Sequence, residues 1–174
     1  AKNCAILAAE NDGTILNCEI KNSVLSLKNV ANAGLAAAVN AGTISGTNVT
    51  GTQSNVSGAS AASHTIAANG TVGAVAGLNS GKITGVSAIN VGEFIESSLS
   101  GKTVYGGIAG TNSGSISNSF ASGNVTGGKA DNFVGGLAGR AEKNAKFVNN
   151  YVLVALKCSA SGNGLVGTGA TAHM

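Results

Sequence analysis

The sequence predicts an all-β fold, a single right-handed β-solenoid (a parallel β-helix) of about five coils of about 29 residues, with three short strands in each coil. Two observations predict this fold: a phrase that recurs along the whole chain, and short strand-like runs broken by Asn, Ser and Gly. Composition agrees, because 27 glycines, no proline and only 3% aromatic residues leave side chains too small for the wide core of a sandwich or helical bundle.

The recurring phrase reads Gly34-Leu-Ala-Ala-Ala-Val-Asn-Ala-Gly-Thr-Ile44 in one copy and Gly106-Gly-Ile-Ala-Gly-Thr-Asn-Ser-Gly-Ser-Ile116 in another. The central apolar residues of successive copies are Leu7, Ala36, Val75, Ile108, Leu137 and Leu165. Their spacings of 29, 39, 33, 29 and 28 residues fall in the range of solenoid repeats. Apolar residues alternate within each copy, and helical periodicity is never sustained, so the repeats are expected to form strands.

These spacings predict one solenoid domain over 1–174. The predicted divisions are coil 1 at 4–32, coil 2 at 33–71, coil 3 at 72–104, coil 4 at 105–133, coil 5 at 134–163 and a partial coil at 164–174. Stacking should align equivalent residues into core ladders, with Gly or Asn at positive φ in the corners. One predicted ladder is Ile15, Ile44, Ile83, Ile116 and Phe147, and another is Cys4, Ala33, Val72, Tyr105 and Val134.

Coil 2 departs from the repeat, because 46–65 adds about ten small and polar residues to it. This insertion is interpreted either as an irregular loop or as a contact surface, since insertions in solenoids collect on the binding face.

The repeat resembles the GLUG repeat of bacterial surface proteins. The likeness rests on Tyr105-Gly-Gly-Ile-Ala-Gly110, Asn112-Ser-Gly-Ser-Ile116 and Asn118-Ser-Phe-Ala-Ser-Gly123. It is good over 72–152, weaker over 4–50 and absent over 51–70. Repeats of this type occur in large secreted adhesins and beside the peptidase domains of immunoglobulin-A-protease-like enzymes. The resemblance implies an extracellular β-helical spacer or binding region and transfers no catalytic residue.

Candidate chemistry is sparse. His64 and His173 are isolated, so no metal site is expected. The chain has only seven acidic residues, and Glu93 and Glu96 would point to opposite faces of a strand, so no catalytic pair is expected. The sequence therefore predicts no catalytic, metal-binding or cofactor-binding residue and no enzyme.

The remaining charge and hydropathy also exclude classes of partner. A net charge of +3 is spread over scattered lysines with few aromatic residues beside them, which argues against nucleic-acid binding. No apolar run reaches the about 18 residues of a membrane helix, so membrane insertion is not expected.

The three cysteines are Cys4, Cys18 and Cys158. About four coil steps, or ~19 Å, separate Cys158 from the other two, so it cannot pair with either inside one straight solenoid. A Cys4–Cys18 disulfide and two unpaired thiols both remain open.

The chain shows no charged or proline-containing cap at either end, where isolated solenoids hide their terminal edges. We therefore expect a secreted or cell-surface structural protein that assembles head to tail into a fibre or layer. The residues expected at the contact between subunits are Cys4, Cys18, Cys158, Leu165 and Val166. A disulfide between Cys158 of one subunit and Cys4 or Cys18 of the next becomes possible there. The alternatives are an adhesin-type module that binds a surface glycan or protein and, less favoured, an ice-binding solenoid.

Overall fold

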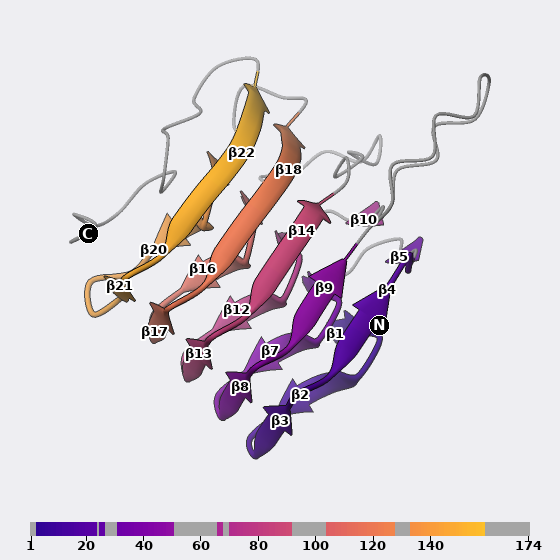
Figure 1. The fold of residues 1–174 in the computed structure, drawn as a ribbon, viewed down its shortest axis with the longest axis vertical. Coiled ribbons are helices and arrows are strands. Elements are labelled where there is room, and N and C mark those ends of the chain that lie inside the picture. Colours follow the sequence, from indigo (N-terminus) through magenta and orange to yellow (C-terminus); the bar gives the residue numbers. More distant parts are fainter. Residues whose placement is uncertain are drawn as a thin grey trace.

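The computed structural model describes residues 3–23, 25–26, 31–50, 66–67, 70–91, 104–127 and 133–158. These residues form strands, turns and bends without any helix. All of the strand pairs are parallel, and the strands stack in the order of their repeats (Figure 1). The predicted all-β solenoid of stacked parallel strands is therefore confirmed.

Four sheets of five strands each make up the body of the molecule. The first sheet contains β1 (Asn3–Ala5), β6 (Asn32–Gly34), β11 (Thr71–Gly73), β15 (Val104–Gly106) and β19 (Phe133–Gly135). The second sheet contains β2 (Ala8–Asn11), β7 (Ala37–Asn40), β12 (Ala76–Asn79), β16 (Ala109–Asn112) and β20 (Ala138–Ala141).

The third sheet contains β3 (Thr14–Leu16), β8 (Thr43–Ser45), β13 (Lys82–Thr84), β17 (Ser115–Ser117) and β21 (Lys146–Val148). The fourth sheet contains β4 (Glu19–Lys21), β9 (Asn48–Thr50), β14 (Ser87–Val91), β18 (Phe120–Gly127) and β22 (Tyr151–Cys158). A separate small pair joins β5 (Leu25–Ser26) to β10 (Ile66–Ala67).

Each group of four successive strands is called a unit here. Unit 1 is β1–β4, unit 2 is β6–β9, unit 3 is β11–β14, unit 4 is β15–β18 and unit 5 is β19–β22.

The number of strands per coil differs from the three expected, because each unit contributes a strand to all four of these sheets. The apolar run from Tyr105 to Ala109 resembles one strand in sequence, but the chain bends between β15 and β16. Glycine allows this bend: a Cβ added to Gly106 would lie 1.8 Å from the carbonyl oxygen of Ala109. One apolar run is therefore divided between the first and second sheets.

The corner between the third and fourth sheets has the positive φ that the sequence predicts. Its five residues, one per unit, are Asn17, Gly46, Gly85, Asn118 and Asn149, with φ between 49° and 59°. Only glycine adopts this left-handed conformation without penalty, and asparagine tolerates it better than other residues. This requirement explains why Asn and Gly alone occupy the corner.

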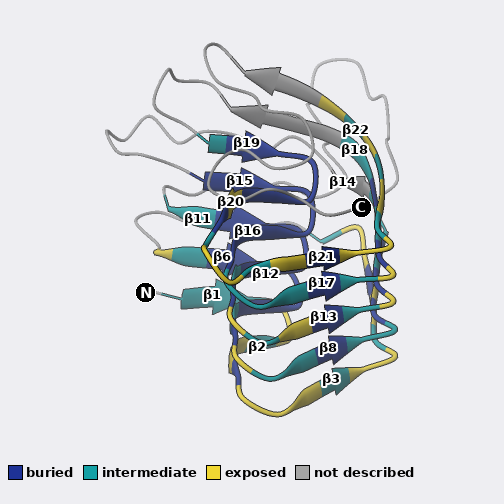
Figure 2. Cartoon of the chain, turned by 90° about the vertical axis from the view of Figure 1, so that its left-hand side faces the viewer, coloured by how far each residue is buried: buried dark blue, intermediate teal, exposed yellow. Residues whose placement is uncertain are grey.

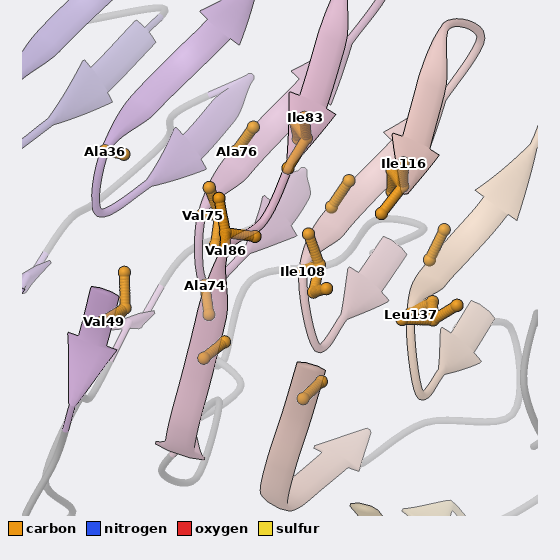
Figure 3. Packing of buried hydrophobic residues seen from close by; sticks show 14 of the residues in the cluster. Ala36, Val49, Ala74, Val75, Ala76, Ile83, Val86, Ile108, Ile116 and Leu137 are labelled. Carbon is orange, nitrogen blue, oxygen red and sulfur yellow. The ribbon is translucent and has the colours of Figure 1, made fainter. Parts of the chain in front are cut away.

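Both predicted core ladders are confirmed by the strand register. Ile15, Ile44, Ile83, Ile116 and Phe147 follow one another through the third sheet. Cys4, Ala33, Val72, Tyr105 and Val134 do so through the first sheet. Ile83 and Ile116 are fully buried and adjacent in Figure 3, where Val75, Ile108 and Leu137 form a parallel row from the neighbouring corner. The third-sheet ladder thus stacks isoleucine on isoleucine through four units, whereas the first-sheet ladder stacks residues of different size.

Several features that the sequence singles out lie outside the described residues. These are 51–65 of the coil 2 insertion, Glu93 and Glu96, His64 and His173, and the partial coil 164–174 with Leu165 and Val166.

Candidate functional site

The end of the solenoid formed by unit 1 exposes core-type side chains. Ile6 and Leu7 are each 44% exposed, whereas Leu35 and Ala36, which take the same places in unit 2, are fully buried. Figure 2 shows the same contrast along the third sheet, from the largely exposed β3 to the buried centres of β8, β13 and β17. Unit 1 therefore has apolar residues at positions that are buried in an internal unit. On one side, no other described unit covers them.

The backbone at this end is also without a neighbouring unit on one side. The strands β1–β4 are the outermost members of their four sheets, so each has a described strand partner on one side only. Such an edge readily pairs with another strand unless charge, proline or a covering element protects it. The strand β1 (Asn-Cys-Ala) contains none of these.

The opposite end, formed by unit 5, differs. Its core residues Val134, Leu137 and Ala138 are fully buried, and Phe147 is 4% exposed. The sequence places the second uncapped end at the partial coil 164–174, which lies outside the described residues. The last strands, β19–β22, are nevertheless the outermost described members of their sheets.

A buried asparagine ladder links four units at the end of each second-sheet strand. Asn11 donates from Nδ2 to Oδ1 of Asn40 (2.6 Å), Asn40 to Asn79 (2.7 Å), and Asn79 to Asn112 (2.7 Å). The three donors also lie 3.3–3.4 Å from backbone carbonyls of the next unit. Unit 5 has Ala141 at this position, so the ladder stops there.

The sequence predicts only a turn at this asparagine. Its recurrence at one place in four copies of the phrase was the available signal. Burial changes its role, because a buried amide must satisfy both its donor and its acceptor, and the neighbouring unit supplies each.

The structure places two of the candidate cysteines in unit 1, both as free, half-buried thiols. Cys4 heads the first-sheet ladder, and Cys18 lies beside the carbonyl oxygen of Leu16, with Sγ 3.5 Å from it. Cys4 and Cys18 therefore form no disulfide with each other.

Cys158 ends β22, where its backbone pairs with Gly127. The register aligns Glu19 with Tyr151, seven positions before Cys158. Seven residues of strand span about 23 Å, whereas a disulfide needs Cα atoms within about 7 Å. In-register stacking of two chains would thus keep Cys18 away from Cys158, and a Cys4–Cys158 link between subunits stays a prediction.

One outward-facing ladder of the third sheet begins with two threonines. Thr14 and Thr43 continue as Lys82, Ser115 and Lys146, so the third sheet carries no regular threonine array of the kind that orders ice.

On the fourth sheet, Phe120 stacks on Tyr151 with ring centroids 5.6 Å apart and an interplanar angle of 18°. Tyr151 and the nearby Leu153 are more than 60% exposed, which creates an apolar patch near unit 5.

The residues that the structure describes contain no group of three or more His, Cys, Asp or Glu side chains placed to hold a metal ion. The same residues include no helix of the length and hydropathy that a membrane span requires.

Comparison with protein-family models, with curated proteins and with solved structures found no match to this chain.

Proposed function

We propose that this protein is a non-enzymatic structural subunit that is secreted or displayed at the cell surface, where it assembles with copies of itself into a fibre or layer. In this proposal the solenoid is right-handed, as parallel crossovers almost always are, and has about five coils. The single observation that carries the proposal is the uncovered unit 1, whose exposed apolar side chains correspond to fully buried ones in unit 2.

Covering this end would be favourable for two reasons. Burying the exposed parts of Ile6 and Leu7 would contribute about 1 kcal/mol each, since full burial of a large aliphatic side chain is worth about 1.5–3 kcal/mol. A strand added beside β1–β4 would also pair backbone groups that no described strand pairs. Another coil of the same fold provides both.

The test is sedimentation combined with negative-stain electron microscopy of the purified chain at neutral pH over a range of concentrations. We expect filaments or sheets that pellet above a threshold concentration. A monodisperse monomer at every concentration would reject self-assembly. Fractionation of the native cells tests the location, and recovery only from the cytoplasm would reject the surface assignment.

A second candidate is an adhesin-type binding module for a surface glycan, favoured by the exposed Tyr151 and Leu153 and by the stacking of Tyr151 on the half-buried Phe120. Aromatic rings offer a flat apolar face with a polar edge, which suits the alternating apolar and polar faces of sugar rings. Binding to a glycan array that is lost in Tyr151→Ala, but not in Val148→Ala on the third sheet, would support this candidate. Equal binding by both variants would reject the patch as the glycan site.

A further inference from the structure

In the part of the chain that the structure describes, charge is concentrated at the two ends of the solenoid, with opposite sign. Among the side chains that the structure describes, unit 1 carries three acids and one base (Glu10, Asp12, Glu19 and Lys21), a net charge of −2. Among its described side chains, unit 5 carries three bases and one acid (Arg140, Lys143, Lys146 and Glu142), a net charge of +2. Units 2, 3 and 4 together carry Lys82 alone.

The opposite charges also share one edge of the solenoid, where the second sheet turns into the third. Glu19 and Lys21 of unit 1 pair with each other at 2.8 Å, which leaves the unbalanced charge of that unit on Glu10 and Asp12. In unit 5 the four charged side chains that the structure describes lie at this same edge, between the second and third sheets.

The register makes this correspondence specific to one pair. One ladder of the second sheet runs through Glu10, Val39, Leu78, Thr111 and Arg140. Glu10 and Arg140 are therefore equivalent residues at opposite ends of the same row, and both are exposed. If unit 5 of one molecule lay in register beneath unit 1 of another, these two residues would be neighbours about 4.8 Å apart along the stack.

We propose that a second copy of this chain is the partner at unit 1, that it docks through its unit 5, and that an Arg140–Glu10 ion pair selects this head-to-tail register. The inference rests on the proposed self-assembly and adds to it the orientation and register of the junction. The same register places Glu142 of one copy opposite Asp12 of the other, so the Arg140–Glu10 attraction has to outweigh a like-charged pair two residues away.

Existing contacts of both residues are compatible with this junction. Glu10 accepts a hydrogen bond from Nδ2 of Asn3 at 2.7 Å through Oε1. Arg140 pairs through Nε with Glu142 at 3.1 Å, and a guanidinium has further N–H donors for a second carboxylate. Ala141 has no amide to extend the asparagine ladder across the junction, so the Arg140–Glu10 pair is the polar contact that distinguishes this register from others.

Charge reversal provides the test, because it separates the junction from the tendency to assemble. Glu10→Arg brings the described side chains of unit 1 from −2 to 0 and puts a base opposite Arg140, whereas Arg140→Glu brings those of unit 5 from +2 to 0 and puts an acid opposite Glu10. We expect each variant alone to need about fivefold more protein to assemble than wild type, because an attractive pair becomes a like-charged one. An equimolar mixture of the two, and the double variant, should assemble near the wild-type threshold.

The matched control is Lys82→Glu, which changes the net charge as Arg140→Glu does but lies in unit 3, away from both ends. It should assemble like wild type. High salt should raise the wild-type threshold and narrow the difference between wild type and the reversed variants, since exposed pairs are screened at about 1 M ionic strength. Pelleting assays report the threshold, and thermal unfolding checks that each variant is folded.

Two outcomes would overturn the inference in distinguishable ways. If wild type assembles but both reversals and their mixture behave like Lys82→Glu, the Arg140–Glu10 junction is wrong while self-assembly stands. If wild type never assembles, both are wrong. Growth that stops at a dimer would also contradict a head-to-tail junction, which repeats without closing.

Discussion

Asn79 donates a hydrogen bond from Nδ2 to Oδ1 of Asn112, 2.7 Å away, although the two residues are 33 positions apart and neither is exposed to solvent. Asn79 accepts an equivalent bond from Asn40, so it links three units at one edge of the core. The polar groups inside this solenoid are thus satisfied by neighbouring units rather than by water, and stacking and hydrogen bonding depend on each other.

We expect Asn79→Ala to lower the free energy of unfolding by about 2–4 kcal/mol. The substitution removes two buried side-chain hydrogen bonds and leaves the Nδ2 of Asn40 and the Oδ1 of Asn112 without these ladder partners. Urea unfolding below the assembly threshold measures the change. The exposed Asn144→Ala is the control, and equal midpoints for the two variants would show that the ladder contributes nothing.

We expect Ile116→Asp to abolish folding and Ser115→Asp to be tolerated. Ile116 is fully buried between Ile83 and Phe147 of its ladder, and an unpaired buried charge costs several kcal/mol against a total stability of about 5–15 kcal/mol. Ser115 is half-buried and lies next to it on the opposite face. Far-ultraviolet circular dichroism and solubility compare the two, and equal behaviour would contradict the register.

We expect Gly106→Ala to destabilise the fold by about 1–3 kcal/mol or more, whereas Gly13→Ala has little effect. A Cβ at Gly106 would lie 1.8 Å from the carbonyl oxygen of Ala109, so the bend between β15 and β16 would have to move. A Cβ at Gly13, in the exposed turn of unit 1, would meet nothing within 4 Å. Thermal unfolding of both variants measures the difference, and similar melting temperatures would reject the steric argument.

We expect Cys4 and Cys18 to be modified by an alkylating reagent without prior reduction, because both are free and half-buried. Peptide mapping of the unassembled chain under non-reducing conditions identifies the modified residues. A peptide cross-linked between Cys4 and Cys18 would contradict the free thiols of the structure.

The repeat spacing alone predicted which residues stack. Parallel strands place equal positions of successive copies above one another, so aligning the copies of the phrase already yields the ladder from Ile15 to Phe147. The prediction failed at the bend after Gly106, because the alternation of apolar residues does not reveal where the chain changes sheets. It also missed the asparagine ladder, because a turn residue and a buried ladder residue look alike in sequence.

By itself, then, the sequence determined the fold class, the register and the left-handed corners at positions such as Asn17 and Gly46, all of which follow from local conformational preference and repeat length. Only the tertiary structure decided that Ile6 stays exposed where Leu35 is buried, and that Glu10 and Arg140 lie at opposite ends of one row. Burial and charge environment depend on which unit lies above and below a residue, and repeats that are nearly identical in sequence become different at the ends of the stack.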